Sequence, residues 1–372
     1  MRRIVFKLGS SVVADGEGAP RVEVLAGFCD VLAELHTEGV ETIVVTSGAI
    51  AHGMRVMTLP QRPTSIGELQ AASAVGQGKL YRVYDELLRE RGVTSAQVLL
   101  TFFDMSARTH YLNARKTLTT LLEWRVLPVI NENDTTATDE ISFGDNDFLA
   151  AQVAVLVAAD ELILMTDIDG LYTADPRVHA DARIVAEVSD FGALDELEIG
   201  HTTSPLGSGG MRSKVVAAEM ATAAGIATVI CNGLRTESLR AVLAGEPGGT
   251  RFPAGEARYS SFKLWLKYAK PARGTLLIDA GAVRAVREGT ASLLPVGVVG
   301  VLGDFDAGDA VEIAARGTGG GEAGSGPVLG KGICNYSAEE LRRVVGLKSG
   351  AVREILPRAT EEAIHRDYLV MD

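Results

Sequence analysis

The sequence predicts an α/β fold in which helices cover a mainly parallel sheet, followed by a small β-rich domain. Apolar strand-like runs alternate with glycine-rich turns and amphipathic helical stretches, which is the pattern of βα repeats. The chain has 372 residues, more than one compact core usually holds. The character of the sequence also changes after Leu243, where a Pro/Gly-rich segment precedes short β-like runs.

The βα repeats can be followed in order along the first part of the chain. Residues 2–8 (RRIVFKL) predict a buried strand, 22–38 a helix closed by Gly39, and 41–46 a second strand. Further strands are expected at 96–100, 126–131, 161–166 and 227–231, and further helices at 107–124, 146–159 and 213–224.

The second part of the chain is predicted to be β-rich. The segment AGEPGGTRFPAGEA (244–257) indicates a linker, and short strands are expected at 274–278, 297–302 and 310–313. The glycine-rich tract 317–326 is typical of a flexible surface loop. We therefore expect a first domain at 1–250, a linker at 251–271 and a second domain with a C-terminal extension at 272–372.

Composition points to the cytoplasm and away from membranes. The three cysteines match no zinc spacing and indicate buried thiols in a reducing compartment. The apolar run before Lys7 is too short for a signal peptide. The longest apolar stretch, 149–165, contains Gln152, Asp160 and Glu161, so no membrane span is expected.

The net charge of −12 is unevenly distributed. Residues 251–372 hold 16 basic and 15 acidic side chains, so the acidic excess lies in the first 250 residues. An acidic surface disfavours nucleic acid as the main ligand of the first domain, and the near-neutral second domain leaves that question open.

Five turns carry candidate chemistry, although the sequence has no G-x-x-x-x-G-K-[ST] fingerprint and no G-x-G-x-x-G at the first strand. A lysine followed by glycine and serines at a helix start, as in KLGSS (7–11), can bind phosphate. Alone, Lys7 could equally be a surface lysine at a strand end. The other four turns are TSGAI (46–50), NENDT (131–135) with FGDND (143–147), TDIDGLY (166–172) with DPR (175–177), and GSGGMRSK (207–214).

Taken together, these segments resemble the glutamate 5-kinase family of the amino acid kinase superfamily, over essentially the whole chain. The region from Gly274 onward resembles the PUA domain that follows the kinase domain in many members. The resemblance implies an αβα sandwich with a mainly parallel central sheet, the amino acid kinase fold. It also implies a phosphotransferase with a carboxyl group as acceptor, making L-glutamyl 5-phosphate from ATP and L-glutamate for proline biosynthesis. Ser208 departs from the threonine that is usual there, and 317–326 looks like an insertion.

The same resemblance implies roles for individual residues. Charge stabilisation of the transferred group falls to Lys7 and Lys214, which Asp147 orients. Glutamate would be bound by Ser47, Gly48, Ala49, Asp134 and Asn146. The ATP site would be lined by Lys7, Thr166, Asp167, Ser208, Gly209, Gly210, Met211, Arg212, Ser213 and Lys214. Mg²⁺ would be held by phosphate oxygens and water, with no all-protein metal site.

Two alternatives remain open from the sequence. One is a related kinase for N-acetylglutamate, aspartate, carbamate or a nucleoside monophosphate. The other is RNA binding by the PUA-like domain, because basic and aromatic side chains alternate over 258–273. We favour a packed helix for that segment. The family also suggests feedback inhibition by proline and a homodimer or homotetramer.

Overall fold

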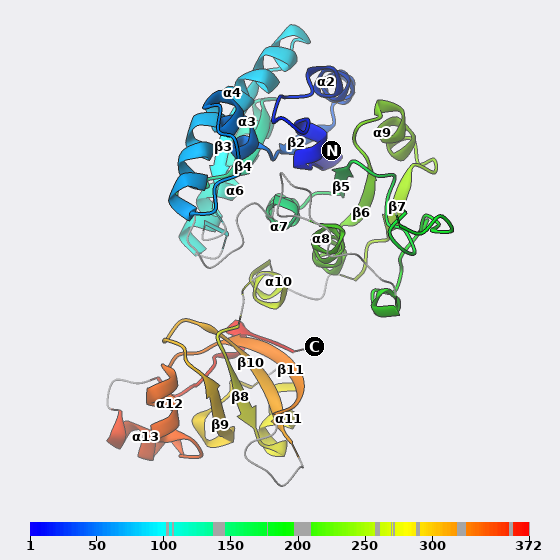
Figure 1. Ribbon diagram of the computed structural model, residues 1–372. Helices are drawn as coiled ribbons and strands as arrows, with labels where there is room; N and C mark the ends of the chain where they lie inside the picture. Colours follow the sequence, from blue (N-terminus) through cyan, green and yellow to red (C-terminus); the bar gives the residue numbers. More distant parts are fainter. Residues whose placement is uncertain are drawn as a thin grey trace. The chain divides into compact units, whose positions relative to one another are not determined.

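The computed structural model describes residues 1–101, 104–105, 108–136, 146–176, 178–196, 210–256, 261–268, 270, 272–287, 291–317, 325–356 and 360–371. The chain forms two compact units, Met1–Arg258 and Tyr259–Asp372 (Figure 1). The division falls within residues 251–271, the segment that was expected to be a linker.

The first unit is built on a seven-stranded sheet in the order β3-β4-β2-β1-β5-β6-β7. Every neighbouring pair is parallel except β6 and β7, which confirms the predicted mainly parallel sheet. The strands are β1 (Arg3–Leu8), β2 (Glu41–Val45), β3 (Ser95–Leu100), β4 (Leu127–Glu132), β5 (Glu161–Thr166), β6 (Ala227–Asn232) and β7 (Gly249–Phe252).

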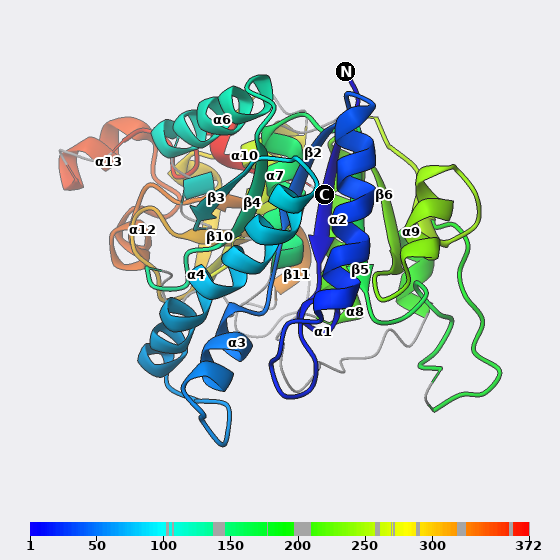
Figure 2. The same ribbon diagram turned by 90° about the horizontal axis from the view of Figure 1, so that it is seen from above.

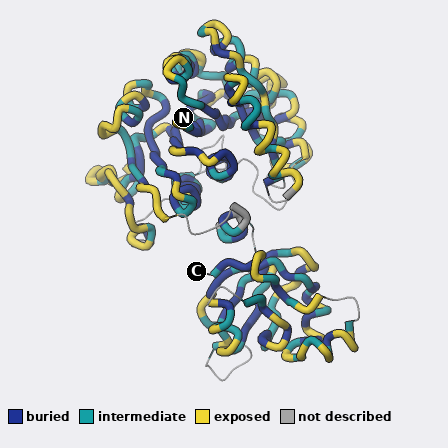
Figure 3. The backbone as a smooth tube through the Cα atoms, turned by 180° about the vertical axis from the view of Figure 1, so that it is seen from behind, coloured by how far each residue is buried: buried dark blue, intermediate teal, exposed yellow. Residues whose placement is uncertain are grey.

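Helices cover both faces of this sheet, with α2 and α9 on one face and α7 and α8 on the other (Figure 1, Figure 2). The central strands read as almost continuous apolar runs because both faces are covered, and Figure 3 shows them buried. The helices are α1 (Ser10–Val13), α2 (Val22–Thr37), α3 (Ala49–Val56), α4 (Ile66–Glu90), α6 (Arg108–Glu123), α7 (Asn146–Leu156), α8 (Met211–Ala223) and α9 (Thr236–Leu243), with a 3-10 turn at Gly192–Glu196.

The register brings the strand ends to one edge of the sheet. Lys7 of β1 pairs with Val45 of β2 on one side and with Leu164 of β5 on the other. Val45 in turn pairs with Ile130 of β4. The turns that follow these four strands therefore leave the sheet at the same carboxyl edge, where ligands of parallel sheets bind.

The core beneath this edge is apolar. On the face covered by α2, the ring of Phe6 meets that of Phe28 edge-on at 5.6 Å. Cys29 and Cys231 are buried in the same core, and burial raises the pKa of each thiol to about 12. Such thiols are inert at neutral pH, in agreement with the predicted structural role.

Helices α3 and α4 are absent from the elements predicted above, and they pack unusually closely. A Cβ atom added to Gly53 of α3 would lie 1.8 Å from the carbonyl oxygen of Ala72. One added to Gly76 of α4 would lie 2.0 Å from the carbonyl oxygen of Ala49. The two helix backbones therefore touch at positions that only glycine can occupy.

The expectation of a linker over residues 244–257 is wrong for part of that segment. Residues Gly249–Phe252 form β7, which pairs antiparallel with β6 at the edge of the first sheet. Glycine and proline are typical of linkers, but a strand on a sheet edge tolerates both at its ends.

The second unit is built on a five-stranded sheet in the order β12-β11-β10-β8-β9. The predicted β-rich character is confirmed. Its elements are α10 (Ser261–Tyr268), β8 (Gly274–Ile278), α11 (Ala280–Arg287), β9 (Val298–Gly303), β10 (Ala310–Arg316), β11 (Ser325–Ile333), α12 (Ala338–Val344), α13 (Ser349–Ile355) and β12 (Leu369–Met371), with 3-10 turns at Pro295–Gly297 and Arg366–Tyr368. In the glycine-rich tract, 318–324 lie outside the described residues, and Ser325 already begins β11.

Within the described ranges, no helix combines the length and the apolar character needed to cross a bilayer. The longest, α4, has 25 residues but carries charged side chains along its exposed face.

The contact between α3 and α4 yields a first prediction. Gly76→Ala should lower the free energy of unfolding by about 1–3 kcal/mol, because the new methyl group overlaps the Ala49 carbonyl. Gly78→Ala is the matched control, since an added Cβ there meets nothing within 4 Å. Gly78→Ala should raise the free energy of unfolding by about 0.5–1 kcal/mol, because alanine is more favourable than glycine in a helix interior. Urea unfolding followed by circular dichroism measures both, and equal effects at the two positions would contradict the close packing.

Candidate active site

Three charged side chains that are distant in sequence meet at the carboxyl edge of the first sheet. The carboxylate of Asp147 lies between two lysines, with Oδ1 2.7 Å from Lys7 Nζ and Oδ2 3.0 Å from Lys214 Nζ. All three are buried, with exposed fractions of 4% for Lys7, 0% for Asp147 and 5% for Lys214. The residues predicted to act on the transferred group thus form one ion cluster.

Each member of this cluster lies where an element begins or ends. Lys7 is the last residue but one of β1, the central strand of the sheet. Asp147 is the second residue of α7, where the helix dipole favours a carboxylate. Lys214 is in the first turn of α8, which begins after Gly210 in an extended conformation.

The electrostatics of the cluster favour an added anion. Burial by itself would raise the pKa of Asp147, but the charges of Lys214 and Lys7 and a hydrogen bond from Ser213 hold it far below its usual value. The Ser213 hydroxyl donates to Asp147 Oδ2 at 2.8 Å. Counted by themselves, two ammonium groups and one carboxylate leave one positive charge in excess, which a phosphate group can balance.

A second group of predicted residues is joined by neutral hydrogen bonds. The side-chain amide of Asn146, the first residue of α7, donates from Nδ2 to Ser47 Oγ at 3.0 Å and to Asn131 Oδ1 at 3.0 Å. Ser47 follows β2, and Asn131 lies in β4. Gly48, which follows Ser47 in the turn after β2, has a φ of 99°, a left-handed conformation that suits glycine. Ala49 then begins α3, so backbone N–H groups of this turn lie at a helix start.

Asp134 is buried apart from the lysine cluster. Its Oδ2 accepts a hydrogen bond from the Ser73 hydroxyl of α4. Burial raises the pKa of Asp134, although that hydrogen bond and the charge of Arg62 act in the opposite direction. A buried carboxylate with incomplete compensation is suited to receive a cationic group such as an ammonium.

The residues predicted to line the ATP site are only partly described. Thr166 is buried at the end of β5, and its hydroxyl donates to the carboxylate of the exposed Asp167 at 3.1 Å. Gly210, Met211, Arg212 and Ser213 open α8, with Arg212 exposed. Ser208 and Gly209 lie outside the described residues.

The turn after β5 is held from β6 by contacts that the sequence did not indicate. The backbone N–H of Gly233 donates to the Thr166 carbonyl at 2.7 Å. Asn232 Nδ2 donates to Asp169 Oδ1 at 2.8 Å, and Arg235 pairs with the same carboxylate. The hydrogen bond from Asn232 is the main reason why the pKa of Asp169 is lowered.

Helix α4 contributes three further polar residues that were not predicted from the sequence. Ser73 bonds Asp134, Gln77 accepts from Asn131 Nδ2, and the Tyr84 hydroxyl bonds Thr46 Oγ1 at 2.9 Å. Their spacing of four and seven residues puts them on one face of the helix. The sequence did contain a signal for these contacts, because the three polar residues share a helix face with the buried Ala72, Gly76 and Leu80.

The carboxylate at the centre of the lysine cluster is not arranged as a Mg²⁺ ligand. Asp147, the buried carboxylate nearest the lysines, is already engaged by two ammonium groups and a hydroxyl. Among the described residues, no three His, Cys, Asp or Glu side chains are grouped as metal ligands. Phosphate oxygens of a bound nucleotide and water are the ligands that this ion usually keeps, and they stay the expected ones here.

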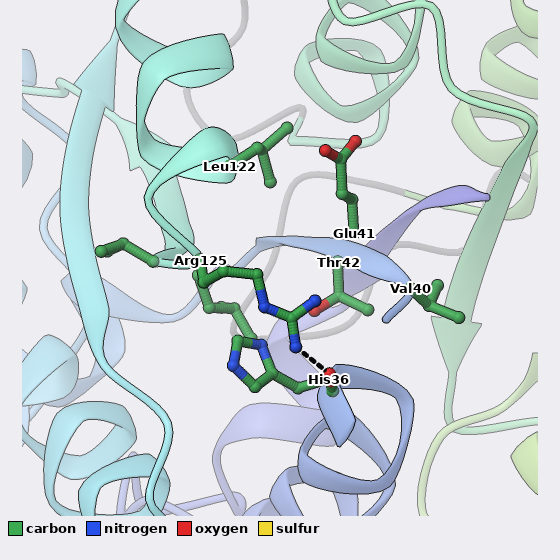
Figure 4. Close-up of a pocket in the computed structure, with 8 residues that line it drawn as sticks. His36, Val40, Glu41, Thr42, Leu122 and Arg125 are labelled. Carbon is green, nitrogen blue, oxygen red and sulfur yellow. Dashed lines mark hydrogen bonds between the residues drawn. The ribbon is translucent and has the colours of Figure 1, made fainter. Parts of the chain in front are cut away.

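A small pocket elsewhere in the first unit is not part of this site (Figure 4). Its lining includes Glu41 and Leu127, which begin β2 and β4, whereas Lys7 lies near the end of β1. The pocket thus lies at the amino edge of the parallel strands. Arg125, which also lines it, donates to the His36 carbonyl.

Comparison with protein families gives matches to both units. The amino acid kinase family matches residues 2–232, and the PUA domain matches residues 274–356. The first match covers more than half of the chain, and its range contains Lys7, Asp147 and Lys214. Both matches agree with the resemblance that the sequence motifs had indicated.

Three relatives that are similar over the whole chain are glutamate 5-kinases. A glutamate 5-kinase from Synechococcus sp. (strain JA-3-3Ab) is 44% identical over 370 residues, covering 99% of this chain and 98% of that protein. One from Meiothermus ruber is 43% identical over 371 residues, covering 100% and 96%. One from Streptomyces coelicolor is 45% identical over 372 residues, covering 100% and 96%.

The raised pKa of Asp134 yields a prediction on stability. A buried carboxyl whose pKa is higher in the folded chain binds its proton more tightly there, so its ionised form opposes folding at neutral pH. Asp134→Asn should therefore raise the melting temperature at neutral pH. This advantage should shrink as the pH falls through the raised pKa, because the wild-type carboxyl then becomes neutral.

Asp104→Asn is the control with the opposite sign. Burial would raise the pKa of Asp104, but two hydrogen bonds from Thr101 at 2.7 Å, together with the hydrogen bond and charge of His110, lower it. This variant should be less stable than the wild type at neutral pH, and the deficit should vanish in acid. Thermal unfolding from neutral to acid pH tests both, and a destabilised Asp134→Asn at neutral pH would show that Ser73 and Arg62 compensate the charge fully.

Proposed function

We propose that this chain, which belongs to the amino acid kinase family and has glutamate 5-kinases as full-length relatives, transfers the γ-phosphoryl group of ATP to the γ-carboxylate of L-glutamate. The products are L-glutamyl 5-phosphate and ADP, and the reaction is the first step of proline biosynthesis. The observation that carries the proposal is the buried cluster in which two lysines share one aspartate.

The chemistry of the acceptor explains why such a cluster suffices. A glutamate γ-carboxylate has a pKa of about 4.3, so it is ionised at neutral pH and needs no general base. One of its oxygens forms a bond to the γ-phosphorus while the bond from that phosphorus to the bridging oxygen of ADP breaks. Both reactants are anions, so the enzyme must align them and cancel charge.

Lys7 and Lys214 supply the cancelling charge. In this proposal their ammonium groups contact the phosphates and follow the charge that develops on the transferred group. Asp147 holds both ammonium groups on one carboxylate, so their positions are set before substrate binds. Magnesium, when bound to the nucleotide, would supply further neutralisation of the phosphate charge.

Glutamate recognition is assigned to the hydrogen-bonded half of the site. Asp134 and Asn146 offer acceptors for the substrate ammonium, and Ser47, Gly48 and Ala49 offer donors for a carboxylate at the start of α3. The ATP site is assigned to Thr166, Asp167 and residues 208–214.

The second unit receives no RNA-binding role in this proposal. Helix α10 packs on its own unit, where Leu264 and Leu266 are fully buried. Lys331 Nζ also donates to the Lys267 and Lys270 carbonyls at 3.1 and 2.9 Å. This packing supports the predicted structural role for the segment over RNA binding. Feedback by proline, a homodimer or homotetramer and a cytoplasmic location stay with the proposal as family expectations.

The direct test is an assay of ADP release. The chain is incubated with ATP, Mg²⁺ and L-glutamate, and with N-acetylglutamate, aspartate, carbamate or UMP as alternative acceptors. We expect turnover with glutamate that EDTA abolishes, and the same assay with added proline tests feedback. Turnover with another acceptor in place of glutamate would overturn the assignment.

The two lysines yield a kinetic prediction. Lys7→Ala and Lys214→Ala should each lower kcat by about 100-fold or more and change the glutamate KM little, because the charges act mainly in the transition state. Asp134→Ala should instead raise the glutamate KM by about tenfold or more, as loss of a charged hydrogen bond does. Lys79→Ala, at an exposed position of α4, is the control for loss of a lysine. An unchanged kcat in either buried-lysine variant would remove that residue from the reaction.

A further inference from the structure

We propose that Gln77 of α4 is a positioning residue that selects for the amino group of the substrate, by fixing which atom of the Asn146 side chain faces it. This inference rests on the proposed function, because it assigns Asn146 to glutamate binding. It deepens that function by naming a residue that controls recognition without touching the substrate.

A chain of side-chain amides links Gln77 to the site. Gln77 Oε1 accepts a hydrogen bond from Asn131 Nδ2. This leaves Asn131 Oδ1 to accept from Asn146 Nδ2 at 3.0 Å. Asn146 Nδ2 also donates to Ser47 Oγ at 3.0 Å. Each side-chain amide in this series is therefore oriented by an acceptor: Gln77 Oε1 orients Asn131, and Asn131 Oδ1 orients Asn146.

The consequence appears at the last amide. Both N–H groups of Asn146 are used, so only its carbonyl oxygen Oδ1 remains for a ligand. That oxygen is buried and receives no hydrogen bond from the residues that the structure describes, while Asn146 as a whole is 4% exposed. A buried acceptor without a donor is unfavourable, so a ligand that brings a donor is favoured at this point. The ammonium group of an amino acid is such a donor.

Gln77 decides this orientation because an asparagine amide can also bind the other way round. If residue 77 offers no acceptor, Asn131 loses the partner that keeps its Nδ2 turned away from Asn146. A rotated Asn131 would present Nδ2, and Asn146 would then turn its own Oδ1 toward Asn131. An N–H group would now face the substrate ammonium, and the preference for an amine would be lost.

Helix α4 is suited to this task because several contacts fix its position. Its backbone touches α3 at Gly53 and Gly76, the residue just before Gln77. Two other contacts, from Ser73 to Asp134 and from Tyr84 to Thr46, bind the same helix to the strand ends. A side chain on this helix can therefore hold an acceptor at a constant place.

The test compares glutamate with glutarate, which has the same two carboxylates and no amino group. Dissociation constants of both are measured by calorimetry on the full chain with Mg²⁺ and a non-hydrolysable ATP analogue. In Gln77→Leu, the preference for glutamate over glutarate should fall by about ten- to hundredfold, the worth of a hydrogen bond to a charged group. Gln77→Glu keeps an acceptor for Asn131 Nδ2 and should restore the wild-type preference.

Ala74→Leu introduces the same leucine side chain at an exposed position of the same helix, and this control should bind both ligands as the wild type does. If Gln77→Leu weakens glutamate and glutarate by the same factor, or changes neither, the positioning role is overturned. Loss of the preference in Gln77→Glu as well would also overturn it. A wild-type chain that binds no glutamate would instead overturn the proposed function, and this inference with it.

Discussion

The ion pairs of the Asp147 carboxylate with two buried lysines are the interaction on which the candidate active site depends. Two ammonium groups can be buried together only if an anion lies between them, since each repels the other in a medium of low polarity. Asp147 satisfies both and thereby joins β1, α7 and α8 at one point. Counted by themselves, these three groups carry one positive charge in excess, which a phosphate group can balance.

The part of the site that we propose for glutamate is organised by the orientation of side-chain amides instead of by charge. Thr46, Asn131 and Asp134 lie at or just after the ends of β2 and β4, and each is bonded by a side chain of α4. The glycines between α3 and α4 matter here, because they let α4 lie close enough for short side chains such as Ser73 to reach the strand ends. The lysine cluster supplies charge, and the amides of Asn131 and Asn146 supply a fixed geometry. Together they suit the proposed reaction, in which ATP, a polyanion, reacts with a small amino acid.

The alternation of strands and helices, the mainly parallel sheet and the β-rich second unit were predictable, because βα repeats leave a strong local pattern of apolar runs and glycine turns. Helices α3 and α4 were not among the predicted elements. Strand β7 was not predicted either, because its glycine and proline neighbours resemble those of a linker. The contacts of Gln77 and Ser73 could not be predicted from the sequence either. A polar residue on a helix is exposed in most proteins, and nothing local shows that its partner lies 54 or 61 residues away.

By itself, the sequence determined the class of fold, the family to which the chain belongs and the set of turns that are proposed to carry chemistry. These properties reside in local patterns, and burial of apolar runs enforces them wherever they occur. Only the tertiary structure decided that Lys7 and Lys214 share one carboxylate, and that the amide of Asn146 presents its oxygen. Both depend on distances of about 3 Å between segments far apart in the chain, at which hydrogen bonds and ion pairs act and which no local pattern encodes.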